Sequence, residues 1–414
     1  MTVKSIHKGS WLLAVLLLVA LSFGRPPASA HEPITTKVTF NKEIARIFQK
    51  SCWGCHTEGK VKGDIPLSTY EEARPWAKAI KEEILEKRMP PYQAVKGYGS
   101  FAHDYILPQR EIELIVSWVE GGAPKGEAKH YPAAKNGWAL GAPDLLLQPE
   151  KESQLSGEGE EVARCYALPT GLKANAWLRA LDFQPGNGPL VQRATFVLHT
   201  GAGNPCGKAA GVANPNLLGQ WAPGQAPLQL PTGTGRLLPA GAQIQMTIHY
   251  RLNGEAARDR SQLALYFAKP QAKEVAPKAV RYVALTAAPV KLAAKDELQP
   301  VKATLTLTEA TEVIAVRPLL FPFGQSVEVT AHRPDGSSEV LIWARNYRFN
   351  WQPDYVFRKP LVLPRGTRLE ATAYLDNSDN NPNNPNETAK AVSLNEPLCE
   401  LLITSSVVPK PKPK

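Results

Sequence analysis

The spacing of hydrophobic residues changes once along the chain, near residue 126. Before that point apolar residues recur with the helical period of about 3.6, and the segments 41–51, 69–88 and 109–120 each carry an apolar stripe. Pro108 begins the third segment and Gly121–Gly122 end it, as is typical of helix termini. The sequence therefore predicts an all-α N-terminal region.

After residue 126, short runs of alternating apolar and polar residues are separated by Gly, Pro and Asn turns. The runs include AWLRALDFQ, QIQMTIHYRL, SVEVTAHRP and RLEATAYLD. Alternation with a period of two marks half-buried strands, and this spacing predicts antiparallel sandwiches. We expect two sandwiches, at 143–268 and 279–405, with the Pro- and Lys-rich stretch 269–278 as the seam and a basic tail at 406–414.

The first thirty residues predict an export signal. Lys4 and Lys8 precede the apolar stretch WLLAVLLLVALSF, and ASA at 28–30 fits a small-residue cleavage site. The stretch is too short to favour a membrane span, although an uncleaved anchor is the alternative. We therefore expect a signal peptide at 1–30, a periplasmic or extracellular mature protein, and no transmembrane segment after cleavage.

The net charge changes this picture little. The formal charge is +10, from 48 Lys and Arg against 38 Asp and Glu. Six of the cations lie in the leader and the tail, namely Lys4, Lys8, Arg25, Lys410, Lys412 and Lys414. No Lys/Arg run is interleaved with aromatic residues, so nucleic acid is not an expected partner.

The motif SCWGCH at 51–56 is the strongest chemical signal in the chain. Two thiols three positions apart, Cys52 and Cys55, can each form a thioether to one haem edge, and the adjacent His56 then reaches the iron. The alternatives are a zinc knuckle and a dithiol redox pair. Zinc would need a second CxxC or a His cluster, and a thioredoxin-like motif would sit in a βαβ unit. The motif therefore predicts one covalent haem c.

Met89 is the candidate sixth ligand of the haem iron. The chain has three methionines, and Met1 is lost with the leader. Pro90 and Pro91 end the preceding helix and stiffen the segment that presents the sulfur. Thioether ligation raises the haem potential, which suits electron transfer. The alternative is that Met89 is a core residue.

Residues 38–126 resemble small class I cytochrome c domains. The resemblance rests on SCWGCH and on the MPP…W…GGAP run, which is similar to haem domains fused to other exported bacterial domains. It implies an α-helical cytochrome c domain that exchanges single electrons with a redox partner protein in the cell envelope.

The strand-rich half resembles the copper type II, ascorbate-dependent monooxygenases, the family of the peptidylglycine and dopamine hydroxylases. RCYALPTGL at 164–172 and the stretch 219–250 are similar to its first sandwich, and ARNYRFNWQPDYVF at 344–357 and LDNSDNNPNNPN at 375–386 to its second. The resemblance implies two antiparallel β jelly-roll sandwiches and two copper ions, one per sandwich.

The first copper site that this resemblance implies is incomplete. Its adjacent His-His pair falls on Gln192 and Arg193, and only the third ligand is matched, by His249. A guanidinium next to a copper ion is electrostatically adverse and is no ligand at neutral pH. We expect His249 to mark a vestigial copper position. A non-copper polar pocket with Gln192 and Arg193 is the alternative, and Met246 points to the opposite face.

The second implied copper site has no ligand left. Its His-x-His pair falls on Leu319 and Phe321, and its Met falls on Leu401 or Leu402. We expect apolar side chains to fill this position, and copper is not expected in the protein.

Three cysteines lie outside the haem motif. In an oxidising compartment two of them should pair. We expect Cys165–Cys206, since both lie in the first predicted sandwich, with Cys399 buried in the second. The sequence leaves the other pairings open.

The sequence favours an exported c-type cytochrome that carries single electrons, with the copper-depleted sandwiches acting as a docking or assembly surface. The alternative is an enzyme, a copper monooxygenase that receives its electrons from the fused haem and hydroxylates an organic substrate. A binding protein that uses the old substrate cleft is a third hypothesis. The lost copper ligands favour the carrier over the enzyme.

Overall fold

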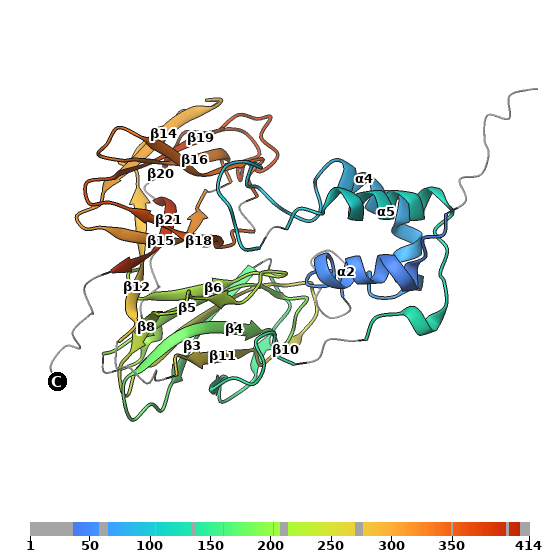
Figure 1. Ribbon diagram of the computed structural model, residues 1–414, viewed down its shortest axis with the longest axis horizontal. Coiled ribbons are helices and arrows are strands. Elements are labelled where there is room, and N and C mark those ends of the chain that lie inside the picture. Colours follow the sequence, from blue (N-terminus) through green and yellow to red (C-terminus); the bar gives the residue numbers. More distant parts are fainter. Residues whose placement is uncertain are drawn as a thin grey trace, which may run out of the picture.

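Figure 1 shows the computed structural model, which describes residues 36–57, 65–103, 105–133, 137–159, 161–201, 203–207, 214–269, 276–320, 322–348, 351–394 and 397–405. The predicted signal peptide, Phe321 and the basic tail lie outside these residues. The described chain is mostly β, with several antiparallel sheets and a small N-terminal helical region at one side of the molecule (Figure 1). The coarse fold prediction is therefore confirmed.

The helical region packs around one aromatic core. Its elements are η1 (Phe40–Ile44), α2 (Ala45–Ser51), α3 (Tyr70–Ala73), η2 (Arg74–Trp76), α4 (Ala77–Leu85), α5 (Gln109–Glu120) and η3 (Ala128–His130). Phe40, Phe48 and Trp118 are fully buried, and each pair of these rings is in contact. The single helix predicted at 69–88 is divided by η2, which contains Pro75, because proline cannot donate a helical hydrogen bond.

The first β region consists of two sheets with a common core. Its strands are β1 (Leu145–Leu147), β2 (Ser153–Leu155), β3 (Glu161–Pro169), β4 (Ala176–Gln184), β5 (Val191–His199), β6 (Leu217–Trp221), β7 (Leu228–Gln229), β8 (Thr234–Leu238), β9 (Gln243–Arg251), β10 (Ala257–Asp259) and β11 (Gln262–Phe267). One sheet has the order β3-β9-β5-β6, and β1-β11-β4-β8 form the other. Strand β9 buries Ile244, Met246 and Ile248 on its core face.

The second β region has the same layered form. Its strands are β12 (Lys278–Thr286), β13 (Val290–Leu292), β14 (Gln299–Thr306), β15 (Thr311–Pro318), β16 (Gly324–His332), β17 (Ser338–Arg345), β18 (Tyr355–Leu363), β19 (Arg368–Leu375), β20 (Val392–Leu394) and β21 (Pro397–Ser405). One sheet has the order β14-β19-β16-β17, and β12-β21-β15-β18 pack against it.

The two β regions are joined by backbone pairing. Strand β8 runs parallel to β12, with Thr234 opposite Lys278 and Gly235 opposite Ala279, so one sheet continues from β1 to β18. The core of the first region also contains Tyr282 and other side chains of the second region. The β regions therefore share part of their core across the seam that the sequence predicts at 269–278.

A segment of the helical region forms part of the second β region. We call residues 92–102 the strap, which runs from the helical region to the second β region in Figure 1. Its backbone N–H···O=C bonds join Arg345 to Gln93 (2.9 Å), Val95 to Trp343 (2.7 Å), Arg358 to Ser100 (2.8 Å) and Ala102 to Val356 (2.7 Å). Ala94 and Phe101 are buried in the core of that region. The strap therefore connects the edges β17 and β18 of its two sheets.

The cysteine prediction is confirmed. Cys165 on β3 forms a disulfide with Cys206 in the loop after β5, and Cys399 on β21 is fully buried. In the part of the chain that the structure describes, no helix is both long enough and apolar enough to cross a membrane.

Candidate functional site

The predicted haem-attachment motif forms a tight turn at the end of α2. The backbone N–H of His56 donates to the carbonyl of Cys52 (2.8 Å), which closes the turn. The His56 Nδ1 lies 3.0 Å from the carbonyl oxygen of Ile65. A carbonyl only accepts, so Nδ1 carries the proton and Nε2 keeps its lone pair. This is the orientation that a histidine needs in order to ligate a metal through Nε2.

The two cysteines of the motif are less accessible to solvent than an exposed dithiol would be. Both side chains are half-buried. Burial, together with the negative charges of Cys55 and Glu111, raises the pKa of the Cys52 thiol to about 12. Trp53 fixes the turn by donating its indole N–H to the carbonyl of Leu67 (2.9 Å).

Met89 lies just after α4 in a half-buried position. Its backbone N–H donates to the carbonyl of Glu83 (3.1 Å), and the following Met89–Pro90 peptide bond is cis. No described hydrogen bond joins Met89 to His56. The turn provides an imidazole with an open Nε2 and two thiols one turn apart, and the Met89 thioether lies in the segment after α4. These are the groups that a covalently attached haem would need.

The predicted haem-attachment turn, Cys52–His56, packs directly on the first β region. A Cβ built on Gly54 would lie 2.9 Å from the Cα of Gly224, and one built on Gly224 would lie 2.8 Å from the Sγ of Cys55. Gly224 also has φ +76°, a conformation that favours glycine. Both glycines are therefore required for this close approach.

Two aromatic residues complete the contact. The phenol oxygen of Tyr105 accepts a hydrogen bond from the backbone N–H of Ala226 (3.1 Å), and its ring packs edge-on against Trp351 with centroids 5.2 Å apart. The indole N–H of Trp351 donates to the carbonyl of Pro223 (3.2 Å). We call the contact of Cys52–His56, Pro223–Ala226, Tyr105 and Trp351 the junction. The junction has no signature in the sequence, because no local pattern marks residues that meet across three parts of a chain.

A cluster of charged side chains is buried near the junction. Arg317 on β15 forms ion pairs with Asp354 (Nη1–Oδ1 3.3 Å) and with Glu400. Tyr282 donates its hydroxyl to Asp354 Oδ2 (3.1 Å), and the Arg317 guanidinium lies over its ring at 4.9 Å. We call these four residues the Arg317 cluster. No local pattern marks the Arg317 cluster, since its members are distant in sequence.

His249 lies on the outer face of β9, next to Arg193 on β5. The Arg193 Nη2 donates to the His249 Nδ1 at 3.3 Å, because a guanidinium can only donate. Burial and the Arg193 charge lower the pKa of His249 to about 4, against a smaller opposing effect of Glu161, so the ring is neutral at pH 7. Its single proton is then on Nε2, and neither nitrogen offers a lone pair to a metal.

The structure also places the other two residues that the sequence analysis named for the first implied copper site, Gln192 and Met246. Gln192 is the bulged residue between Val191 and Arg193 in the pairing of β5 with β9, and no described hydrogen bond joins it to His249. The structure therefore brings Arg193 and His249 together and leaves Gln192 to one side. Met246 is fully buried on the opposite face of β9, as expected.

The residues at the second copper position that the resemblance implies are apolar. Leu319, Leu401 and Leu402 are all buried, Leu401 in the core of the second β region and Leu402 in that of the first, and Phe321 lies outside the described residues. Among the residues that the structure describes, no group of three or more His, Cys, Asp or Glu side chains could hold a metal ion.

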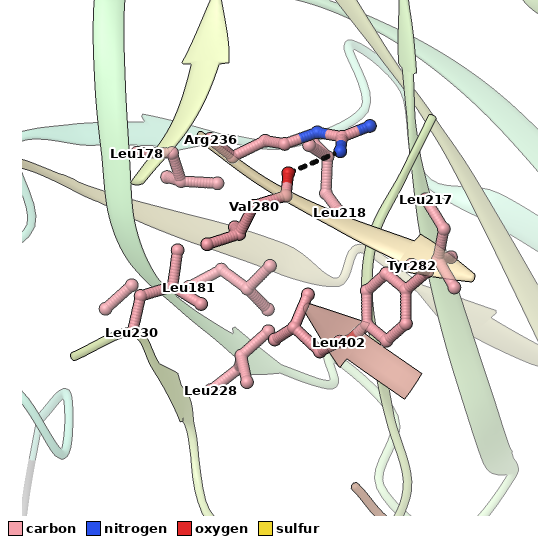
Figure 2. Close-up of a pocket in the computed structure, with 11 residues that line it drawn as sticks. Leu178, Leu181, Leu217, Leu218, Leu228, Leu230, Arg236, Val280, Tyr282 and Leu402 are labelled. Atoms are coloured by element: carbon pink, nitrogen blue, oxygen red, sulfur yellow. Dashed lines mark hydrogen bonds between the residues drawn. The ribbon is translucent and has the colours of Figure 1, made fainter. Parts of the chain in front are cut away.

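A small cavity lies between the two β regions (Figure 2). It is lined mainly by leucines, and Arg236 at its rim donates to the carbonyl of Val280 (2.7 Å). The free space inside it is about the size of one water molecule. The cavity is therefore too small for an organic substrate.

Comparisons with known proteins do not identify a family. No family model and no curated protein matches the chain. Among solved structures, a two-domain protein of unknown function from Bacteroides fragilis is 10% identical over 58% of this chain and 84% of its own, with a TM-score of 0.18. The VP2 subviral particle of infectious bursal disease virus is 10% identical over 63% of this chain and 70% of its own, also with a TM-score of 0.18. TM-scores this low do not indicate a shared fold.

Proposed function

We propose that this chain is an exported c-type cytochrome that carries single electrons. Cys52 and Cys55 would attach the haem through thioethers, and His56 and Met89 would ligate its iron. When bound, the haem supplies an iron that gains and loses one electron. The observation that carries the proposal is the His56 Nδ1 contact with the Ile65 carbonyl, because it leaves Nε2 open beside two thiols.

The residues around the motif hold these groups in place. Trp53 and the Cys52 carbonyl fix the turn, and Pro90 and Pro91 limit the freedom of the segment that presents Met89. A rigid site changes little on reduction, which favours fast electron transfer. The helical region is, in this proposal, a class I cytochrome c domain at 38–126.

The β regions are, in the same proposal, two jelly-roll sandwiches of the copper monooxygenase type that serve as a docking or assembly surface. The hydrogen bond of Arg193 to His249 and the buried leucines at the second position argue against copper. A redox partner protein in the cell envelope would receive or supply the electron. Signal cleavage after residue 30 would place the mature protein in the periplasm or outside the cell.

The test is the metal content and optical spectrum of the mature protein, produced in cells that attach haem to CxxCH motifs. We expect one haem iron per chain, no copper, and haem that stays on the chain after denaturation. The double variant Cys52→Ser/Cys55→Ser should lose the covalent haem, while Cys399→Ala should keep it. A wild-type chain without covalent haem would refute the proposal.

The metal content of the same preparation also tests the alternative function, a copper monooxygenase. Two copper ions per haem would indicate the haem-fused monooxygenase, in spite of the ligand positions. The role of Met89 has its own readout, because Met89→Ala should remove the absorption band of an iron–thioether bond and lower the midpoint potential. A core role for Met89 would change stability and leave the spectrum as it was.

A further inference from the structure

The Arg317 cluster contains more negative than positive charge. Its two carboxylates share one guanidinium, so the cluster has one surplus negative charge when both are ionised. The side chains of Arg317 and Asp354 are each 2% exposed and that of Glu400 is 4% exposed, so water does not screen this charge. A buried charge without a full set of partners is costly, and taking up a proton relieves that cost.

The Arg317 cluster and the haem-attachment turn flank the same tyrosine. Asp354 follows Trp351 in the loop before β18, and the Trp351 ring packs against Tyr105 at 5.2 Å. Burial raises the pKa of Tyr105, the hydrogen bond from Ala226 opposes the rise, and the charge of Asp354 adds to it. Tyr105 therefore lies close to the Arg317 cluster, and its contacts with Ala226 and Trp351 place it in the junction with the turn.

We propose that the Arg317 cluster is a redox-linked proton site, in which Asp354 takes up one proton when the haem gains one electron. The inference rests on the proposed function and adds a proton to the electron that the protein carries. The electron comes from a one-electron donor protein, and the proton comes from a hydronium ion of the solvent. An O–H bond forms on Asp354 and one breaks in hydronium, so charge and atoms balance.

The groups that face Asp354 determine how readily it is protonated. They are Arg317 from β15, Tyr282 from β12, Glu400 from β21 and Tyr105 from the segment before α5. Burial raises the pKa of Asp354, and the charge of Glu400 adds to the rise, whereas Arg317 and the Tyr282 hydroxyl oppose it; the net direction is upward.

An electron held at the predicted haem site would add negative charge at the junction, and Trp351 of the junction lies in the loop that carries Asp354. Coulombic repulsion would then favour the protonated form of the carboxylate. By linkage, the midpoint potential should fall as the pH rises through the range in which Asp354 titrates.

The experiment is a potentiometric titration of the haem-loaded full chain across a series of pH values. The wild type should show a potential that falls with pH, and Asp354→Asn should lose most of that dependence. Asp335→Asn is the matched control, because Asp335 is a carboxylate in an exposed turn and should leave the dependence unchanged. A pH-independent wild type, or an Asp354→Asn variant that keeps the wild-type slope, would overturn the inference.

A second measurement needs no variant. The infrared difference spectrum between reduced and oxidised wild type should show the carbonyl band of a protonated carboxylic acid that appears on reduction and shifts in heavy water. If that band is missing, the inference is wrong even where Asp354→Asn does not fold. A preparation without haem overturns both proposals, whereas a haem-loaded protein with a pH-independent potential overturns this one alone.

Discussion

At the scale of single residues, one side chain decides whether His249 can act as a ligand. The Arg193 guanidinium donates a hydrogen bond to the Nδ1 of His249, and burial together with the Arg193 charge lowers the pKa of the ring. The sequence alone indicated that the Arg193 charge is unfavourable for a metal ion at His249, but it did not indicate the hydrogen bond between the two side chains. The reason is that the bulge at Gln192 sets the register of β5 against β9, and a bulge has no marker in the sequence here.

We expect Arg193→Ala to raise the pKa of His249 from about 4 toward its ordinary value of 6.5. Burial remains in the variant, so the rise should be partial. The measurement is an NMR titration of the His249 ring. Arg251→Ala is the control, since Arg251 is two residues along the same strand and is exposed. An unchanged pKa in Arg193→Ala would show that burial alone lowers it.

The same variant has a predictable effect on acid stability. A histidine whose pKa is depressed in the folded state costs stability as the pH falls through the window from 6.5 to about 4, because the unfolded chain binds the proton first. We expect the wild type to lose more stability across this window than Arg193→Ala does. Urea unfolding at both ends of the window measures the difference, and equal losses would contradict the expectation.

At the scale of elements, the alternation of apolar residues located most strands, while connections were harder. The run AWLRALDFQ coincides with β4, and the predicted helix 109–120 coincides with α5. The strap was missed because residues 92–102 have neither period. Its backbone pairs with strands more than two hundred residues later, and such pairing is decided by tertiary contacts.

The strap makes a steric prediction at two of its glycines. A Cβ on Gly99 would lie 2.5 Å from the carbonyl oxygen of Leu341 and 2.4 Å from the ring of Phe101, whereas one on Gly97 meets nothing within 4 Å. Gly97 and Gly99 both have positive φ, so the backbone strain of an alanine is common to the two variants. We expect Gly99→Ala to lower the free energy of unfolding by about 1–3 kcal/mol more than Gly97→Ala does. If chemical denaturation shows the same loss of unfolding free energy in both variants, the strap does not pack against Leu341 and Phe101 as described.

The disulfide between β3 and the loop after β5 should stabilise the first β region. Cys165 and Cys206 are separated by 41 positions, and a loop of this length corresponds to about 2–4 kcal/mol. We expect Cys165→Ala/Cys206→Ala to lose that much in urea unfolding. Adding a reductant to the wild type should give a similar loss and should not affect the double variant. If the reductant still lowers the stability of the double variant, it acts on another disulfide bond.

At the scale of the whole molecule, the three parts of the chain are joined more closely than the sequence indicated. The sequence predicted a seam at 269–278 from its Pro and Lys content. In the described residues one sheet continues through β8 and β12, and the two β regions share a core. Composition signals a break in hydrophobic pattern, but it carries no information on which strand edges meet beyond the break.

The shared core predicts a common response to mutation. Leu402 on β21 is buried in the cluster that also contains Leu181 and Leu265 of the first β region. We expect Leu402→Ala to cost about 2–5 kcal/mol and to increase hydrogen exchange in β4 and β11 as well as in β15. Val329→Ala is the comparison, since Val329 is buried in the core of the second region only. Faster exchange confined to the second region in Leu402→Ala would show that the two regions open independently.

The strap has a practical consequence for anyone who wishes to isolate the helical part. A fragment that ends near residue 126 would carry Ala94 and Phe101 without the strands that bury them, and the remaining chain would have an open slot between β17 and β18. Expression of either piece alone should yield aggregation-prone material. Mixing the two pieces offers a split-protein system whose reassembly can be followed by the return of solubility.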